Sequence, residues 1–457
     1  METHVKETAP KYSYHIEQFD LRERPRRFLE AFAAILKHSN YGAVLDFYSR
    51  ITTKCARCTV TCPVYQASDD VRDIPCNRSE LLFKIYRRYF TLGGMLRARL
   101  WDSFILTEDY IDRMAEEFWR CTACRRCKLS CPMGIDHAMI THLTRWILSE
   151  IGMVPKALVV SVREQLEGKT RNTSAVPKIA MKDSCEFLEE ELEEELGDRF
   201  PEEGIKFPID VEGAEYVFFP AVSDYLMEAE TLMGNAAVMH AMGVSWTIGS
   251  GNFDGIDYGL FYSDRMWDRI IKAQVAEIKR LGGKVMLIGE CGHASRSARE
   301  GMQNFIPPEE RVPVINCMEL AYENFLSGKL KLKKGVIKER TTYHDPCNIA
   351  RSGWIVDQPR VLLRHICQDF VEMTPGGKDN YCCGGGGGTV SIDEIKDFRM
   401  RIGGKTKADQ IKQTGAHYIV TPCANCKKQI DEIIDFFKID AQRIGLHDLL
   451  LRAVEFD

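Results

Sequence analysis

Four cysteines close together near residue 125 have a spacing that suits a metal cluster. They form a complete C-x2-C-x2-C-x3-C-P run and are Cys121, Cys124, Cys127 and Cys131. Bacterial ferredoxins bind [4Fe–4S] clusters with this spacing, three cysteines holding one cluster and the fourth holding its neighbour. Tight turns let three thiolates converge, and the proline ends the local helix. A zinc site is the alternative, but four-cysteine zinc sites usually use two separated C-x2-C pairs.

A shorter run precedes it and has Thr52 where the first cysteine would stand. Its three cysteines match the last three members of the pattern and are Cys55, Cys58 and Cys62. If the fourth cysteines cross over, Cys62 completes the cluster of residues 121, 124 and 127, and Cys131 joins the second cluster. Cys76 is the other cysteine of this region and the predicted last ligand of that second cluster. A [3Fe–4S] centre without Cys76 is the alternative.

Five cysteines of the C-terminal half form a third constellation near the ends of predicted strands. They are Cys347, Cys382, Cys383, Cys423 and Cys426. Five thiolates exceed what one cube needs, and adjacent ones can bridge irons or bind different ones. The glycines at 384–388 permit positive φ and let backbone N–H groups approach sulfur closely. The alternatives are a zinc site with a spare cysteine and a flexible glycine linker, although a linker does not normally lie inside an α/β lobe.

The elements that must position these cysteines differ between the two halves of the chain. The 457 residues predict two or three domains. We expect an N-terminal helical segment at 1–50, a ferredoxin-like domain at 51–150, an acidic helical connector at 151–212, and an α/β domain at 213–457. In the last of these, short apolar runs alternate with long helical patterns, which predicts parallel strands with crossover helices. The predicted fold class is therefore α+β for the whole chain, with an α/β C-terminal part.

The C-terminal domain contains a weak internal repeat at an offset of 132 residues. Residues 275–291 match residues 407–423, so that Cys291 corresponds to Cys423 and Ser250-Gly251 to the cysteine pair. The repeat predicts a duplicated lobe in which only the second copy, about 340–457, keeps a cluster motif. Cys291 and His293 could face the intact cluster as an extra ligand or a proton donor, and His344 could deliver a proton to a leaving thiolate. For all three residues, a purely structural role is equally compatible with the sequence.

Composition and charge narrow the class of protein. The net charge of −5 and the pI near 6.2 show no bias toward nucleic acid. No apolar run is long enough to span a membrane, and the N-terminus lacks a signal-peptide core, so we expect a cytoplasmic protein. In a reducing compartment the 17 cysteines favour metal or redox chemistry over disulfides. The basic amphipathic stretch at 79–104, with an expected helix break at Gly93-Gly94, is interpreted as a solvated helix surface, and a partner-binding surface is the alternative.

The motifs HDPC, YCCGGGGG and PCANC resemble the CCG domain found in the B and D subunits of heterodisulfide reductase. The order of the ferredoxin and CCG motifs is most similar to HmcF, TmcB and DsrK, subunits of membrane-bound redox complexes. The resemblance implies that the five cysteines bind one noncubane [4Fe–4S] cluster, which reduces a heterodisulfide in one-electron steps. It also implies two ferredoxin-type clusters. The first repeat departs from the family pattern, which makes a second noncubane cluster unexpected.

These observations together predict an oxidoreductase subunit that lies on the inner face of the cytoplasmic membrane through its partners. Electrons would pass between an integral haem- or quinone-handling subunit and a disulfide or thiol substrate, either a small protein or a small molecule. No G-x-G-x-x-G follows a predicted strand, so neither flavin nor NAD is expected. The alternative is a pure electron relay for a flavoprotein dehydrogenase of the glycolate or glycerol-phosphate type. A zinc-stabilised scaffold is the non-redox alternative.

Overall fold

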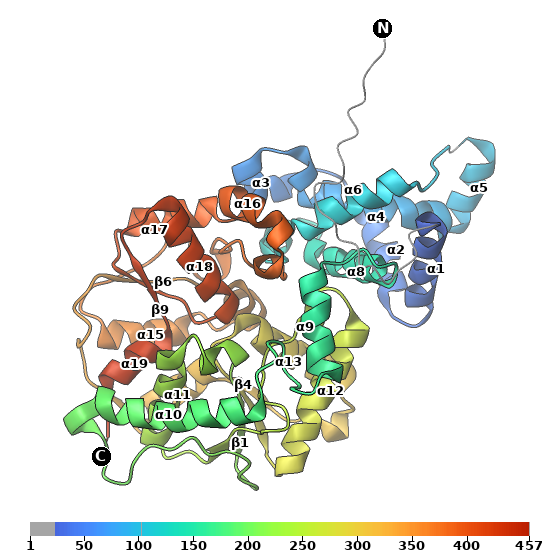
Figure 1. Ribbon diagram of the computed structural model, residues 1–457. Helices are drawn as coiled ribbons and strands as arrows, with labels where there is room; N and C mark the ends of the chain where they lie inside the picture. The colour runs from blue at the N-terminus through green and yellow to red at the C-terminus, as the bar shows by residue number, and fades with distance from the viewer. Residues whose placement is uncertain (1–22, 102, 457) are drawn as a thin grey trace. The chain divides into compact units, whose positions relative to one another are not determined.

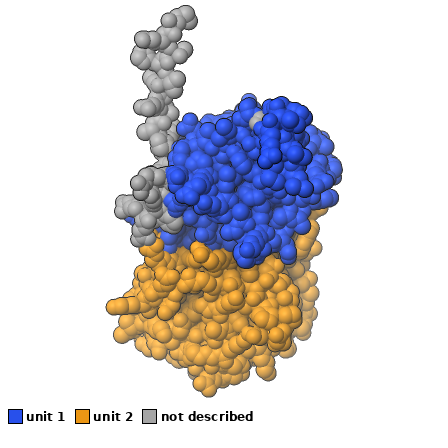
Figure 2. Space-filling model, turned by 90° about the vertical axis from the view of Figure 1, so that its right-hand side faces the viewer, with its two compact units in different colours: residues 1–159, 261–263, 386–403 blue, residues 160–260, 264–385, 404–457 orange. Residues whose placement is uncertain are grey.

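The computed structural model describes residues 23–101 and 103–456, so the first 22 residues of the predicted N-terminal segment lie outside the described residues. The chain divides into two compact units, which Figure 2 colours separately. Unit 1 comprises residues 1–159, 261–263 and 386–403, and unit 2 comprises 160–260, 264–385 and 404–457. The segment 386–403, which begins inside the glycine run, therefore packs with the N-terminal half of the chain.

Unit 1 is built from helices (Figure 1). They are α1 (Arg24–Lys37), α2 (Tyr41–Ile51), α3 (Pro63–Ser68), α4 (Pro75–Tyr89), α5 (Leu92–Leu100), α6 (Glu108–Trp119), α7 (Arg126–Ser130), α8 (His137–Glu150) and, from the later segment, α16 (Lys396–Phe398). The helices α4 and α8 supply much of its core through residues such as Leu82, Phe83 and Leu143, all of which are buried. Helix α9 (Lys156–Glu167) begins in unit 1 and ends in unit 2.

The helix break predicted at Gly93-Gly94 lies slightly earlier in the chain. Helix α4 ends at Tyr89, and Thr91 caps α5 by accepting a hydrogen bond from the Gly94 amide. The two glycines are therefore helical. Gly94 is needed for close packing, because a Cβ at this position would lie 1.7 Å from the Arg87 carbonyl oxygen. Gly94 marks a close approach between two helices, whereas a Cβ at Gly93 would meet no atom within 4 Å. The start of α5 itself is capped by the threonine.

Unit 2 contains two four-stranded parallel sheets with the same strand order. The first sheet has the order β2-β1-β3-β4 and the second has β7-β6-β8-β9. The strands are β1 (Tyr216–Phe219), β2 (Trp246–Thr247), β3 (Val285–Ile288), β4 (Val314–Asn316), β6 (Thr341–Tyr343), β7 (Phe370–Val371), β8 (Tyr418–Val420) and β9 (Gln442–Ile444). In each sheet the first strand in sequence pairs with the second and the third, which is the arrangement expected of a duplicated lobe.

Helices surround these sheets and complete the α/β part that the sequence predicts. They are α10 (Lys178–Leu196), α11 (Ala229–Ala241), α12 (Asp264–Leu281), α13 (Gly292–Phe305), α14 (Cys317–Ser327), α15 (Asp357–Ile366), α17 (Lys405–Thr414), α18 (Ala424–Phe437) and α19 (Leu446–Ala453). A short antiparallel pair joins β5 (Lys331–Leu332) to β10 (Val454–Glu455). The predicted fold class is confirmed. Within the described residues, no helix is long and apolar enough to cross a membrane.

Candidate iron–sulfur sites

Two groups of four cysteines line two separate cavities in unit 1. The first cavity, with an open volume of about 400 Å³, is lined by Cys62, Cys121, Cys124 and Cys127. Between the last three cysteines, Ala123 and Arg125 adopt positive φ of 50° and 62°, which turns the chain tightly enough for their thiols to face one space. The Ala123 amide donates a hydrogen bond to the Cys121 sulfur over 3.4 Å. This grouping matches the crossing pattern inferred from the spacing.

The second cavity has an open volume of about 310 Å³ and brings together the other four cysteines. They are Cys55, Cys58, Cys76 and Cys131. Hydrogen bonding with the Cys58 thiol lowers the pKa of Cys76 to about 7, which favours the thiolate that a metal requires. Cys76 reaches the cavity from the first turn of α4, whereas Cys55 and Cys58 belong to the preceding loop and short helical turn. The side chain of His137 lies in the wall of both cavities.

Cys76→Ala tests the one assignment among these eight that concerns a cysteine outside the two ferredoxin-type runs. If Cys76 is a ligand, the substitution leaves one cavity with three cysteines and the other unchanged. We expect the iron content of the reconstituted protein to fall, and one [4Fe–4S] signal in electron paramagnetic resonance (EPR) to be lost or replaced by a three-iron signal. Cys185→Ala, at a buried thiol on α10, is the matched control and leaves both signals intact. Two full signals in Cys76→Ala would remove Cys76 from the ligand set.

The five cysteines of the third constellation are all buried in unit 2, near the carboxyl ends of the second sheet. Cys347 precedes a π-helical turn that follows β6, the pair Cys382-Cys383 lies in the loop after β7, and Cys423 is the N-cap of α18 after β8. Ligand sites of parallel α/β sheets form at this edge, because the carboxyl ends of the strands meet there. The sulfur atoms of Cys383 and Cys426 are 3.3 Å apart.

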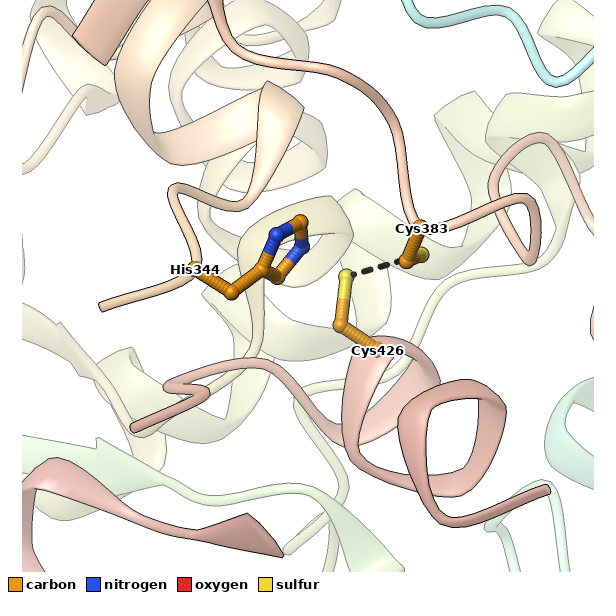
Figure 3. Close-up of side chains that lie close together, drawn as sticks. All are labelled: His344, Cys383 and Cys426. Atoms are coloured by element: carbon orange, nitrogen blue, oxygen red, sulfur yellow. Dashed lines mark hydrogen bonds between the residues drawn. The ribbon is translucent and has the colours of Figure 1, made fainter. Parts of the chain in front are cut away.

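His344 completes a compact group with two of these cysteines (Figure 3). One nitrogen of its ring and the sulfur atoms of Cys383 and Cys426 all lie within 4.8 Å of one another. The side chain is fully buried, and neither ring nitrogen has a geometric hydrogen-bond partner among the described protein groups. Burial lowers the pKa of His344, so the imidazole is neutral near pH 7. A neutral imidazole can bind a metal or donate one N–H, but it is a poor source of protons.

The degenerate repeat contributes Cys291 and His293 to the same place. Cys291 is the N-cap of α13, as Cys423 is of α18, and its sulfur lies 3.2 Å from Nδ1 of His293. Hydrogen bonding from Cys291, with further contributions from Cys426 and His293, lowers the pKa of Cys423 well below its usual value. A methyl group at Gly292 would lie 3.4 Å from the Cys423 sulfur. The structure therefore brings both residues to the third site, where they stay candidates for a ligand or a proton donor.

The glycine run, residues 384–388, is divided between the two units, with Gly384 and Gly385 in unit 2 and the other three glycines in unit 1. The amides of Gly384 and Gly385 point at the Cys382 and Cys383 sulfurs over 3.4 Å each, the contacts that the sequence predicts for this loop. Gly384 and Gly387 have φ of 96° and 62°, values that disfavour other residues. In unit 1, a Cβ on Gly387 would lie 3.1 Å from the Cys121 carbonyl oxygen. The first part of the run therefore faces thiols, and the later part lies against the backbone of the ferredoxin motif.

Sequence reasoning did not identify the charged groups around the third site. Lys407 on α17 is fully buried, and burial lowers its pKa to about 8 against the opposing effect of Asp345 and the thiols of the third site. Asp345 itself accepts two 2.8 Å hydrogen bonds from Arg360 and so anchors the HDPC strand end. Lys407 stands among other lysines in the sequence, and only its burial distinguishes it.

In the first repeat, the loop that corresponds to the cysteine pair is Ser250-Gly251. Its amides contact carboxylates, whereas the amides of the loop in the second repeat contact thiols. The Gly251 amide donates to Glu277, and the Ser250 amide donates to Asp210, over 2.8 and 2.9 Å. Arg280 bridges the same two carboxylates. The backbone donors of this loop are therefore satisfied by side chains of the chain itself, which explains how the fold keeps the loop without cysteines.

All three sites gather the sulfur donors that iron–sulfur clusters require, and the five cysteines of the third site are also buried. Thiolates are soft ligands, and four around one cavity also suit zinc. The third site, with five cysteines on three chain segments, exceeds the four ligands of a tetrahedral zinc site. The residues present therefore fit iron–sulfur clusters with cysteine ligation.

Two family models match this chain in the regions of these sites. A model described as a 4Fe-4S dicluster domain matches residues 53–135, and one described as a Cysteine-rich domain, CCG, matches residues 341–431. The first range spans all eight cysteines of unit 1, and the second spans the five cysteines of the third site together with His344 and Lys407.

Curated relatives match over most of the chain. One is the Hdr-like menaquinol oxidoreductase iron-sulfur subunit 2 of Archaeoglobus fulgidus, 28% identical over 93% of this chain and 83% of its own length. Another is the D subunit of the dihydromethanophenazine:CoB–CoM heterodisulfide reductase of Methanosarcina barkeri, 23% identical over 88% of this chain and 93% of its own. The EtfAB:quinone oxidoreductase of Syntrophomonas wolfei is 24% identical over 69% of this chain but 43% of its own length.

Proposed function

Because this chain belongs to the CCG-domain iron–sulfur proteins similar to the D subunit of heterodisulfide reductase, we propose that it carries electrons between a membrane-bound redox partner and a disulfide or thiol substrate. The chain is an iron–sulfur electron-transfer subunit of an oxidoreductase. The burial of five thiols together with Lys407, His344 and His293 is the observation that carries the more specific proposal.

We assign the eight cysteines of unit 1 to two ferredoxin-type [4Fe–4S] clusters. The five cysteines of the third site would hold a noncubane [4Fe–4S] cluster, which when bound supplies one-electron chemistry to a substrate sulfur. The protein around it excludes water, because all five cysteines are buried, and it directs the Gly384 and Gly385 amides at their sulfurs. Such donors stabilise negative charge on sulfur and raise the reduction potential of the site.

The charged side chains of the third site have separate tasks in this proposal. Reducing a disulfide takes up two electrons and two protons and releases two thiols. Lys407 can hold a proton on Nζ near the site, since burial brings its pKa to about 8. His293, in contact with the Cys291 sulfur, is the second candidate proton donor. His344, which burial keeps neutral, is better suited to orienting the sulfur atoms than to supplying a proton.

The proposed partners are based on the names of the relatives, which include a menaquinol oxidoreductase and a quinone oxidoreductase. We propose that an integral haem- or quinone-handling subunit exchanges electrons with unit 1, and that this chain is peripheral on the inner face of the membrane. A pure relay function is the second candidate, favoured by the relative whose name couples EtfAB to quinone. In that case the third site passes electrons to a flavoprotein and binds no disulfide.

The test is to oxidise the reduced, reconstituted protein with the CoM–CoB heterodisulfide, a small symmetric disulfide and an oxidised protein dithiol. We expect about twelve irons per chain and a new paramagnetic signal with at least one disulfide. Cys383→Ser should lose the signal, whereas Cys367→Ser, at a buried cysteine after α15, should retain it. If the protein has its full iron content but responds to none of the disulfides, the pure relay function is the one supported. Stoichiometric zinc would contradict both functions.

A further inference from the structure

The residues of α5 and those that follow it expose an unusual number of large apolar side chains. Within unit 1, six of them lie in residues 92–105, each between 45% and 79% exposed, and we call them the α5 patch: Leu92, Met95, Leu96, Leu100, Trp101 and Ile105. Exposed apolar residues normally occur singly on a protein surface. Six of them within one short segment of the chain point to an interaction surface.

The fold of unit 1 does not need these side chains. The only buried residue of α5 is Gly94, which lets the helix pack closely against the end of α4. The remaining α5 side chains point away from that contact and are exposed or half-buried. In Figure 1, α5 projects at the edge of the N-terminal helices. The leucines are therefore not explained by packing within the described residues of the chain.

The charge around the α5 patch is opposite to that of the whole chain. Between residues 84 and 105 the sequence has five basic residues, Lys84, Arg87, Arg88, Arg97 and Arg99, and one acidic residue, Asp102, whereas the chain carries −5. Arg97 and Arg99 are exposed on α5 itself. The Lys84 and Arg88 side chains lie over the rings of Phe104 and Tyr89. Apolar and basic groups are thus interleaved at one place.

We propose that the α5 patch binds the surface of an anionic lipid bilayer and seats unit 1 on the membrane. This inference rests on the proposed function of a subunit with a membrane partner. Helix α5, with nine residues, is too short to span a bilayer but suits the interface, where leucines enter the acyl boundary and tryptophan lies at headgroup level. The arginine stems can bury while their guanidinium groups meet lipid phosphates.

A bilayer fits these residues better than a groove on a partner protein. A helix that docks in a groove shows one apolar stripe, with polar residues on its other faces. On α5, exposed apolar residues occur at successive positions, Met95-Leu96 and Leu100-Trp101, with arginines between them. A fluid surface that offers apolar tails and anionic phosphates together satisfies such a mixture.

The experiment measures flotation of the full reconstituted protein with vesicles of equal parts phosphatidylcholine and phosphatidylglycerol. We expect binding that weakens at least tenfold in pure phosphatidylcholine and falls with salt. Leu96→Glu with Leu100→Glu should reduce partitioning at least tenfold without changing iron content. The matched control is Leu226→Glu with Met227→Glu, an exposed apolar pair (59% and 75%) in unit 2, and it should bind like the unmodified protein.

A second readout does not depend on the leucine-to-glutamate substitutions. The tryptophan emission of the protein should shift to shorter wavelength with anionic vesicles, and Trp101→Phe should lose most of this shift. If the unmodified protein ignores anionic vesicles, or if the leucine double variant still floats, the proposal is wrong. Loss of co-purification with a membrane subunit, without any vesicle binding, would mean that the α5 patch binds protein. Because the disulfide test is done in solution, its failure would leave the vesicle result unaffected.

Discussion

Replacing Lys427 by methionine is expected to lower the free energy of unfolding by about 3 to 5 kcal/mol, because it leaves a buried carboxylate without its main cation. Lys427 lies on α18, directly after Cys426, and is fully buried. Its Nζ is 3.4 Å from Oε2 of Glu290 and 3.5 Å from Oε2 of Glu228, and it hydrogen-bonds Thr231. These contacts join α18 to the end of β3 and to the region of α11.

The pKa values around Lys427 identify Glu290 as the carboxylate at risk. Burial opposes ionisation of Glu290, but Lys427 and His447 more than offset it and hold its pKa at about 2. Burial raises the pKa of the neighbouring Asp224 to about 8, so Asp224 is protonated near pH 7. Glu228, the other carboxylate beside Lys427, also pairs with Arg443. In the variant, His447 alone faces the charged Glu290, over 2.8 Å.

Denaturant unfolding of the reconstituted protein measures this effect. Lys428→Met is the matched control, since Lys428 is the next residue of the same helix and is exposed. We expect the control to lie within about 0.5 kcal/mol of the unmodified protein. Equal stability of the two methionine variants would show that Glu290 does not depend on Lys427.

The Lys427–Glu290 pair also predicts how the free energy of unfolding depends on pH. The folded pKa of Glu290, about 2, is below its ordinary value of 4.5. Its contribution is therefore fully present above about pH 4.5 and is lost as the pH falls toward 2. It amounts to roughly 3 kcal/mol, from 1.36 kcal/mol per pKa unit. Unfolding measured down to about pH 3 should show a smaller acid loss in Lys427→Met than in the unmodified protein, since the variant has already lost this interaction.

Arg145→Gln is expected to destabilise unit 1 by about 3 kcal/mol and to loosen residues 386–403. Arg145 on α8 is buried, and its guanidinium donates to the carbonyl oxygens of Cys121 over 2.6 Å and Gly387 over 2.7 Å. It also donates to the Phe118 carbonyl over 3.0 Å. A shorter amide cannot reach all three acceptors, and each buried carbonyl that loses its donor costs about 1–3 kcal/mol.

Hydrogen exchange resolves where this loss occurs. In Arg145→Gln, the amides of residues 386–403 should exchange faster, because the Gly387 carbonyl that ties this segment to unit 1 has lost its donor. Residues 404–457 of unit 2 should keep their protection. Arg50→Gln is the control, since its side chain is 75% exposed and pairs only at the surface with Asp46. Unchanged exchange at 386–403 would show that packing alone holds the segment.

The grouping of the eight cysteines of unit 1 could be predicted from the sequence, because the cysteines of one ferredoxin-type motif are only a few residues apart. Within such a run, tight turns determine which thiols can meet, and the crossing rule then groups Cys62 and Cys131 with the opposite run. The structure lines its two cavities with these same groups. The alternation of apolar runs and helical patterns likewise predicts parallel sheets. A strand that is covered by helices on both faces needs a continuous apolar run, and this requirement can be read from the strand's own residues.

Other features depend on packing between distant segments, which leaves no periodic trace in the sequence. The approach of Cys291 to Cys423 joins residues of two repeats, and Lys407 differs from neighbouring lysines only in being buried. Residues 386–403 belong to unit 1, where Gly387 accepts a hydrogen bond from Arg145, a residue 242 positions earlier in the sequence.

The glycine run shows both kinds of information. From the residue types alone, two adjacent thiols followed by glycines predict N–H groups that come close to sulfur. The packing of distant segments assigns this role to Gly384 and Gly385 and places Gly387 against the Cys121 backbone. A Cβ has no room at either place, because at Gly385 it would lie 2.9 Å from Cβ of Gln429 on α18 and at Gly387 it would lie 3.1 Å from the Cys121 carbonyl oxygen.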